Sequence, residues 1–131
     1  MCNRGGVAIL KKSSVGIIQF LLALAFMYFG YMKLTANPMH VENFTEVFGY
    51  GKIIMYGVGA VEVTSSIGLL IGFWKKGFVP ISSGALAVVM VGATSTHLMV
   101  GQGLEIAMKP FIFFVLNVVV FLVSTSESVE D

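Results

Sequence analysis

Glu62 is the residue of this 131-residue chain most able to do chemistry, because its carboxyl group interrupts an apolar stretch at residues 53–73. A charged group near the centre of a bilayer costs about 3 kcal/mol, so we expect Glu62 to face other helices, bind a partner or hold a proton. Lys33, at the end of the preceding apolar stretch, is the obvious partner. Glu62 is then either a catalytic or proton-carrying acid or half of a structural ion pair. Lys33 either turns inward to it or extends toward the membrane surface.

Two more polar residues complete a set of one from each apolar stretch, namely His97 and Asn117. Lys33, Glu62 and His97 fall toward the same side of the predicted membrane region. The sequence therefore predicts a shared polar pocket that opens outward, with all four residues as candidates. His40 is the only other histidine, and no metal-ligand spacing such as H-x-x-x-H occurs, so no metal site is predicted.

The elements that must position these residues are membrane helices. The chain is 56% hydrophobic and only 11% charged, whereas soluble domains have about 25% charged residues. Most of the apolar stretches reach the ~20 residues that cross a bilayer, and backbone polar groups in lipid must be satisfied within a helix. We predict an all-α, integral membrane four-helix bundle in one domain, residues 1–131. The spans are expected at about 15–34, 53–73, 78–99 and 108–124, the last being short.

Lysine and arginine residues predict the orientation. With four spans, both termini and the turn at 74–77 share one side, which holds five of these residues, against three on the other: Arg4, Lys11, Lys12, Lys75 and Lys76 against Lys33, Lys52 and Lys109. This excess favours cytoplasmic termini. The first span is too long for a cleaved signal segment and is expected to remain. Cys2, the single cysteine, excludes an internal disulfide and is expected to be a reduced cytosolic thiol. The net charge of +1 gives no basic surface for nucleic acid.

The connection between the first two spans, residues 35–52, is predicted to hold a short interfacial helix on the outer leaflet. Asn37 and Pro38 form a typical helix start, with Asn at the N-cap and Pro at the first helical position. Apolar residues then recur at helical spacing, at Val41, Phe44 and Phe48, and Gly49 and Gly51 are expected to end the helix. Further along, Gly68 and Gly72 form a G-x-x-x-G pattern that predicts close helix packing.

Several of these segments together resemble a known family. They are Phe29–Leu34 (FGYMKL), Gly59–Glu62 (GAVE), Gly68–Gly72 (GLLIG) and Ala93–His97 (ATSTH). In order and spacing they are similar to the DoxX-like family of small four-helix membrane proteins, over about residues 17–122. The resemblance implies a bundle with both termini on one side, a related pair in Lys33 and Glu62, and helix-packing roles for Gly30 and Gly59. Some family members are subunits linked to quinone reduction, and others assist maturation or assembly of other proteins.

Three functions follow from the residues and the resemblance. The first is a non-catalytic accessory protein that binds a lipophilic molecule or a partner membrane protein, or forms a homo-oligomer. The second is a redox subunit with a quinone cofactor, in which Lys33 or His97 bonds a quinone oxygen and Glu62 relays a proton. The missing cysteine pair weighs against thiol redox chemistry. The third is a solute or proton carrier, disfavoured because four short spans leave little room for alternating access. The expected location is a bacterial inner membrane.

Overall fold

The computed structural model describes the backbone of residues 4–130 and the side chains of residues 13–126. Cys2, and the side chains of Arg4, Lys11 and Lys12 on which the predicted orientation partly depends, lie outside the described residues. The elements are α1 (Arg4–Leu34), α2 (Pro38–Glu42), a π-helical turn η1 (Asn43–Val47), α3 (Lys52–Ile71), α4 (Phe78–Met99) and α5 (Leu104–Glu130). The backbone from residue 4 to residue 130 contains no strand. The predicted all-α class is confirmed.

Four of these helices are long and apolar enough to cross a membrane: Ser13–Leu34, Lys52–Ile71, Phe78–Met99 and Leu104–Ser126. The third has the predicted bounds. The fourth starts earlier than the predicted residue 108 and is as long as the others. Its true start follows Gly103, which has a φ of 91°, and Pro110 lies inside the helix.

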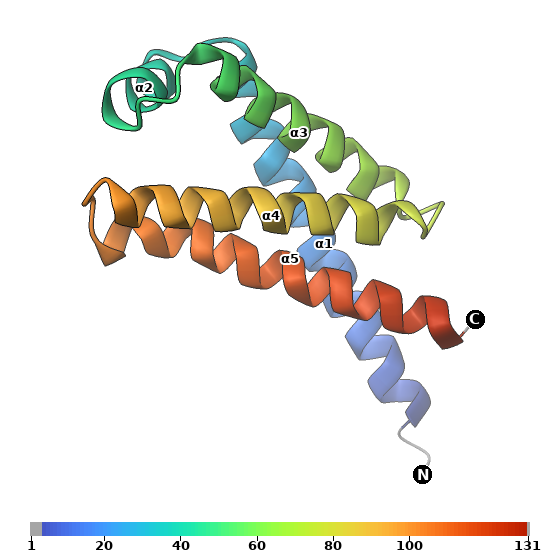
Figure 1. The fold of residues 1–131 in the computed structure, drawn as a ribbon. Coiled ribbons are helices and arrows are strands. Elements are labelled where there is room, and N and C mark those ends of the chain that lie inside the picture. Colours follow the sequence, from blue (N-terminus) through green and yellow to red (C-terminus); the bar gives the residue numbers. More distant parts are fainter. Residues whose placement is uncertain (1–3, 131) are drawn as a thin grey trace.

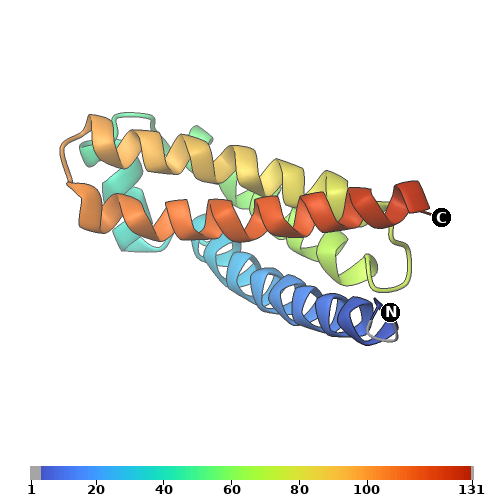
Figure 2. The same ribbon diagram turned by 90° about the horizontal axis from the view of Figure 1, so that it is seen from below.

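The helices form two closely packed antiparallel pairs, α1 with α3 and α4 with α5. Figure 1 shows α3 and α4 meeting at the turn between them and diverging toward α2. Figure 2 shows that the bundle has two distinct ends. The Trp74 end holds the turn at residues 72–77 and the described ends of α1 and α5. The α2 end holds α2, η1 and the turn at residues 100–103. The two ends differ in how tightly the helices pack.

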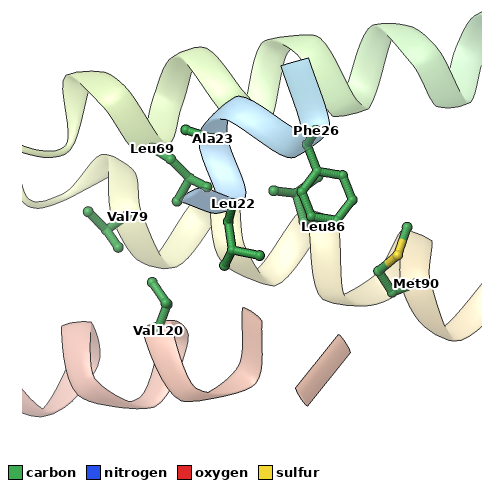
Figure 3. Packing of buried hydrophobic residues seen from close by; sticks show 8 residues of the cluster. All are labelled: Leu22, Ala23, Phe26, Leu69, Val79, Leu86, Met90 and Val120. Atoms are coloured by element: carbon green, nitrogen blue, oxygen red, sulfur yellow. The ribbon is translucent and has the colours of Figure 1, made fainter. Parts of the chain in front are cut away.

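The core lies where all four long helices approach one another (Figure 3). It comprises residues from each of them: Leu22, Ala23, Phe26, Leu69, Val79, Leu86, Met90 and Val120. Phe26 also packs edge-to-face against Phe113, with ring centroids 5.4 Å apart. Since lipid tails are as apolar as these side chains, close packing rather than the hydrophobic effect holds such a core together.

Four glycines set the distances between the helices. A Cβ added at Gly68 would collide with Ser82, and one at Gly72 would collide with Val79, so α3 and α4 touch at the Trp74 end. A Cβ at Gly30 would lie 2.8 Å from the carbonyl oxygen of Gly59, between α1 and α3. Small residues let helix backbones approach in this way. The G-x-x-x-G pattern is therefore used within this chain, between α3 and its neighbour α4.

Candidate functional site

A buried ion pair joins α1 to α3. The Nζ atom of Lys33 lies 2.8 Å from Oε1 of Glu62, and the two side chains are 12% and 1% exposed. This separation is that of a charge-assisted contact. The contact predicted between the two side chains is present, and Glu62 is turned away from lipid. Lys33 points inward, rather than extending along the helix end toward the membrane surface.

The glycine contact between α1 and α3 explains why these side chains meet. Lys33 comes one helical turn after Gly30, and Glu62 comes one turn after Gly59. The two helices are antiparallel, and Cα–Cβ bonds tilt toward the N-terminus of their own helix. Each side chain therefore leans toward the other across the glycine contact. A Cβ at Gly59 would lie 2.9 Å from Cβ of Lys33, so any larger residue at position 59 would push the lysine away.

The ion pair lies in the wall of a cavity of about 510 Å³ at the α2 end. Its lining comes from α3 (Ile54, Val58, Glu62), from residues 89–99 of α4, and from the segment between α1 and α3. The cavity is thus built where α3 and α4 diverge and is covered by α2, η1 and the residues after them. Most of its lining is apolar. Lys33, Glu62 and His97, one from each of α1, α3 and α4, all contribute to this single cavity.

The segment that covers the cavity is fixed at both of its ends. Oδ1 of Asn37 accepts a hydrogen bond from the backbone N–H of Met39 at 3.1 Å, and Pro38 takes the first helical position, as predicted. At the other end, the hydroxyl of Tyr50 lies 2.9 Å from Oγ1 of Thr96 on α4. Phe44 is buried. Phe44 and Phe48, the aromatic residues of the predicted short helix, line the cavity, so this segment forms its lid. Its place on the outer leaflet stays a prediction.

Tyr50 and Phe48 are cavity residues that the sequence analysis did not identify. Phe48 packs against Tyr50, Phe44 and His97, with ring centroids 6.0, 5.4 and 5.4 Å apart. Both residues adjoin Gly49, which has a φ of 76°, a value at which glycine carries no steric cost. The available signal in the sequence was this pair of aromatic residues on either side of a glycine, just before a membrane helix. Such a pattern is consistent with a segment that folds back over the bundle.

Both histidines of the chain line the cavity. His97 has Nδ1 in contact with Oε1 of Gln102, which lies in the turn between α4 and α5. His40, on α2, lies outside the four candidate spans. Its burial, followed by the nearby charge of Lys33, lowers its pKa from the usual value of 6.5. His40 is therefore neutral at pH 7, mainly because it is partly buried and in addition because the Lys33 ammonium lies nearby.

The chain can now be compared with known proteins. The sequence model of the DoxX-like family matches residues 17–120, which cover every residue that lines the cavity. This chain belongs to the DoxX-like family. No curated protein and no solved structure shows a significant match to it. Together with four membrane-length apolar helices, family membership makes it a multi-pass membrane protein.

Asn117 is the one candidate residue that this DoxX-like protein places elsewhere. It lies on α5, which contributes nothing to the described lining of the cavity. Its Nδ2 donates to the backbone oxygen of Phe113 at 2.8 Å, within its own helix. The sequence analysis included Asn117 as the one polar residue chosen from the fourth span, but helix rotation decides which cavity a side chain reaches. Rotation is poorly encoded in a helix that is apolar on all sides.

The arrangement of charge limits what this DoxX-like protein can bind there. Lys33 and Glu62 neutralise each other, and His40 carries no charge at pH 7, so these three groups together have no net charge. Oε2 of Glu62 has no hydrogen-bond partner among the described residues. Within that same part of the chain, no three His, Cys, Asp or Glu side chains lie close enough to hold a metal ion. The site therefore offers an apolar volume with a neutral but strongly polar group in its wall.

Proposed function

We propose that this DoxX-like protein is an accessory membrane protein that binds a lipophilic molecule in the cavity between α3 and α4. The observation that carries the proposal is a 510 Å³, mainly apolar cavity with the Lys33–Glu62 pair in its wall. Small-molecule sites have volumes of about 300–1,000 Å³, mostly apolar walls and a few polar groups that orient the ligand. This cavity has all three properties.

The surroundings of the cavity favour a molecule that arrives from the bilayer. Ile54 on α3 and Met99 on α4 both line it and both have exposed side chains. The entrance is therefore apolar at two points, where a membrane protein meets lipid tails or the interface. The lysine excess on the Trp74 end supports cytoplasmic termini, which would turn the α2 end and the cavity toward the outer leaflet. A bacterial inner membrane remains the proposed location.

Two glycines of the chain allow a direct test. Gly92 lines the cavity, and a Cβ built on it meets no atom within 4 Å. Gly57 on α3 is equally open but does not line the cavity. The substitution Gly92→Leu should fold and place a side chain in or across the cavity, whereas Gly57→Leu adds the same group elsewhere. Native mass spectrometry of protein in lipid nanodiscs would report the molecules that remain bound to each variant.

We expect wild type and Gly57→Leu to retain a bound lipophilic molecule, and Gly92→Leu to lose it. Wild-type protein that carries nothing, or equal occupancy in all three proteins, would refute the proposal. A partner membrane protein that co-purifies equally with all three would instead favour the protein-binding form of the accessory role, in which the cavity has no part.

A quinone-linked redox subunit is the second candidate, because rings surround the polar wall. Phe48 contacts both Phe44 and His97 ring to ring, and all three line the same cavity as Lys33. A planar ring fits such a wall, and Lys33 would donate to a quinone oxygen; a bound quinone would supply two-electron redox chemistry. Chromatography of extracted lipids tests this. An isoprenoid quinone should co-purify with wild type and be depleted in Lys33→Met, and the absence of any quinone from wild type would remove this candidate.

A further inference from the structure

We infer that the molecule bound in the cavity presents a hydroxyl group to Oε2 of Glu62. This inference rests on the proposed function and narrows it to lipophilic alcohols. It comes from one atom: Oε1 of Glu62 faces Lys33 at 2.8 Å, whereas Oε2 lacks any hydrogen-bond partner in the described part of the chain. Glu62 is 1% exposed and lines the cavity.

An acceptor in this situation is rare in folded proteins. More than nine-tenths of buried polar groups have a partner, and each exception calls for an explanation. A charged acceptor left bare costs more than a neutral one. Ser66, one helical turn further along α3, is satisfied by its own helix, because its Oγ donates to the Glu62 carbonyl at 2.7 Å. Oδ1 of Asn117 also lacks a partner among the described residues, but Asn117 does not line the cavity, whereas Glu62 does. Of these two residues, only Glu62 can therefore present its bare oxygen to a molecule in the cavity.

The charges of Glu62 and Lys33 decide which head group of a bound molecule fits beside Oε2. A fatty acid would bring a second carboxylate against Glu62, and like charges at close range repel. An amine would place a second cation beside Lys33. An ester, ether or carbonyl group only accepts hydrogen bonds, so it would leave Oε2 bare. A hydroxyl group is neutral, donates to Oε2 and accepts from Lys33, whose ammonium has three donors.

The shape of the cavity places the rest of the molecule. Ile54, Val58 and Glu62 recur every four residues along one face of α3 and all line the cavity. Glu62 is ten positions beyond the first residue of α3, or about 15 Å along the helix axis. The hydroxyl group thus binds at the inner end of an apolar stripe, and the hydrocarbon part lies along Val58 toward the exposed Ile54.

The test compares three probes of one chain length: 1-dodecanol, dodecyl methyl ether and dodecanoate at pH 7.5. Their dissociation constants are measured by titration of wild-type protein in lipid nanodiscs, with native mass spectrometry as the readout. A hydrogen bond to a charged group is worth roughly tenfold or more in affinity. We expect the alcohol to bind at least about tenfold tighter than its methyl ether, and the carboxylate to bind more weakly than the alcohol.

The substitution Glu62→Gln should weaken this preference, because it replaces the charged carboxylate acceptor with a neutral amide oxygen. Glu105→Gln is the matched control, since Glu105 is exposed in the first turn of α5. If Glu62→Gln does not fold, the three probes on wild type still decide. Equal affinity of alcohol and ether would mean that a water molecule donates the hydrogen bond to Oε2. This result would overturn the inference but leave the proposed function intact. A preference for the acid, or a preference for the alcohol that is undiminished in Glu62→Gln, would overturn it too. Binding of none of the probes would overturn both.

Discussion

Between α3 and α4, the two ends of the bundle use glycine residues for opposite purposes. At the Trp74 end, Gly68 and Gly72 are glycines because Ser82 and Val79 occupy the space that their side chains would need. At the α2 end, Gly92 faces open space and lines the cavity. A glycine in a membrane helix can therefore bring two backbones together or leave volume for another molecule, and only the opposing atoms tell which.

Buried polar groups follow the same division. Toward the Trp74 end, Nε2 of Gln19 donates to the carbonyl of Leu69 at 2.7 Å, and Oγ of Ser83 donates to the carbonyl of Val79 at 2.7 Å. Each bond links a side chain to the backbone, and neither side chain has a buried atom without a partner. Near the α2 end, Glu62 has one oxygen paired with Lys33 and one without a partner. At the packed end these polar groups bond to the backbone, whereas at the cavity end one buried acceptor of a cavity-lining residue has no partner among the described residues.

The largest expected loss of stability comes from breaking the Lys33–Glu62 ion pair. The change Glu62→Ala removes the anion and leaves the ammonium of Lys33 largely buried, which typically costs 3–5 kcal/mol, so we expect a loss of about that size in the free energy of unfolding. Denaturant titration of the purified protein in detergent micelles measures it. The pair Lys33→Met with Glu62→Leu should recover most of the loss, because well-packed apolar groups commonly replace a buried ion pair at little cost.

Unchanged unfolding of Glu62→Ala would show that water or detergent reaches Lys33 freely, and that the α2 end is open around the pair. Ser66→Ala is a suitable control. It lies one turn further along α3, is fully buried and loses one hydrogen bond within its own helix. Its cost should be near 1 kcal/mol.

A matched substitution at the two ends should give opposite signs. Gly68→Leu forces a side chain into Ser82 and separates α3 from α4, and such overpacking costs about 1–3 kcal/mol or more. Gly92→Leu meets open space and replaces a glycine inside a helix, which gains up to about 1 kcal/mol. Melting temperatures in detergent should therefore fall for the first and hold or rise for the second. A fall of the same size in both would erase the distinction between packed and open ends.

The sequence predicted much of the fold because its strongest signals are local. Span lengths, the helix start at Asn37 and Pro38, and the cost of a bare carboxylate at Glu62 each depend on a few neighbouring residues. The lid over the cavity depends on Phe48 and Tyr50 reaching α4, which only the packed chain specifies. Asn117 shows the same limit, since α5 is apolar on every face and hydropathy cannot orient it. What remained beyond the sequence was the rotation of helices and the path of the loop.

The smallest expected effect concerns pH, and it too should be confined to the α2 end, where both histidines of the chain lie. Burial and the charge of Lys33 lower the pKa of His40 from 6.5. Above pH 6.5 the folded and unfolded chains both hold it neutral, so it has no effect on stability. As pH falls below 6.5 the unfolded chain takes up the proton first, so stability declines until the lower folded pKa is reached. The slope for one proton is at most about 1.4 kcal/mol per pH unit.

The difference in free energy of unfolding between pH 7.5 and pH 5.5 should therefore shrink in His40→Gln, while its value at pH 7.5 changes little. The comparison between wild type and variant cancels the carboxylates, which titrate in both. A wild-type protein that loses no more stability than His40→Gln over this interval would mean that His40 is neither buried nor close enough to the charge of Lys33 to lower its pKa. In that event the lid would not be held over the ion pair, and the cavity would be open to solvent on that side.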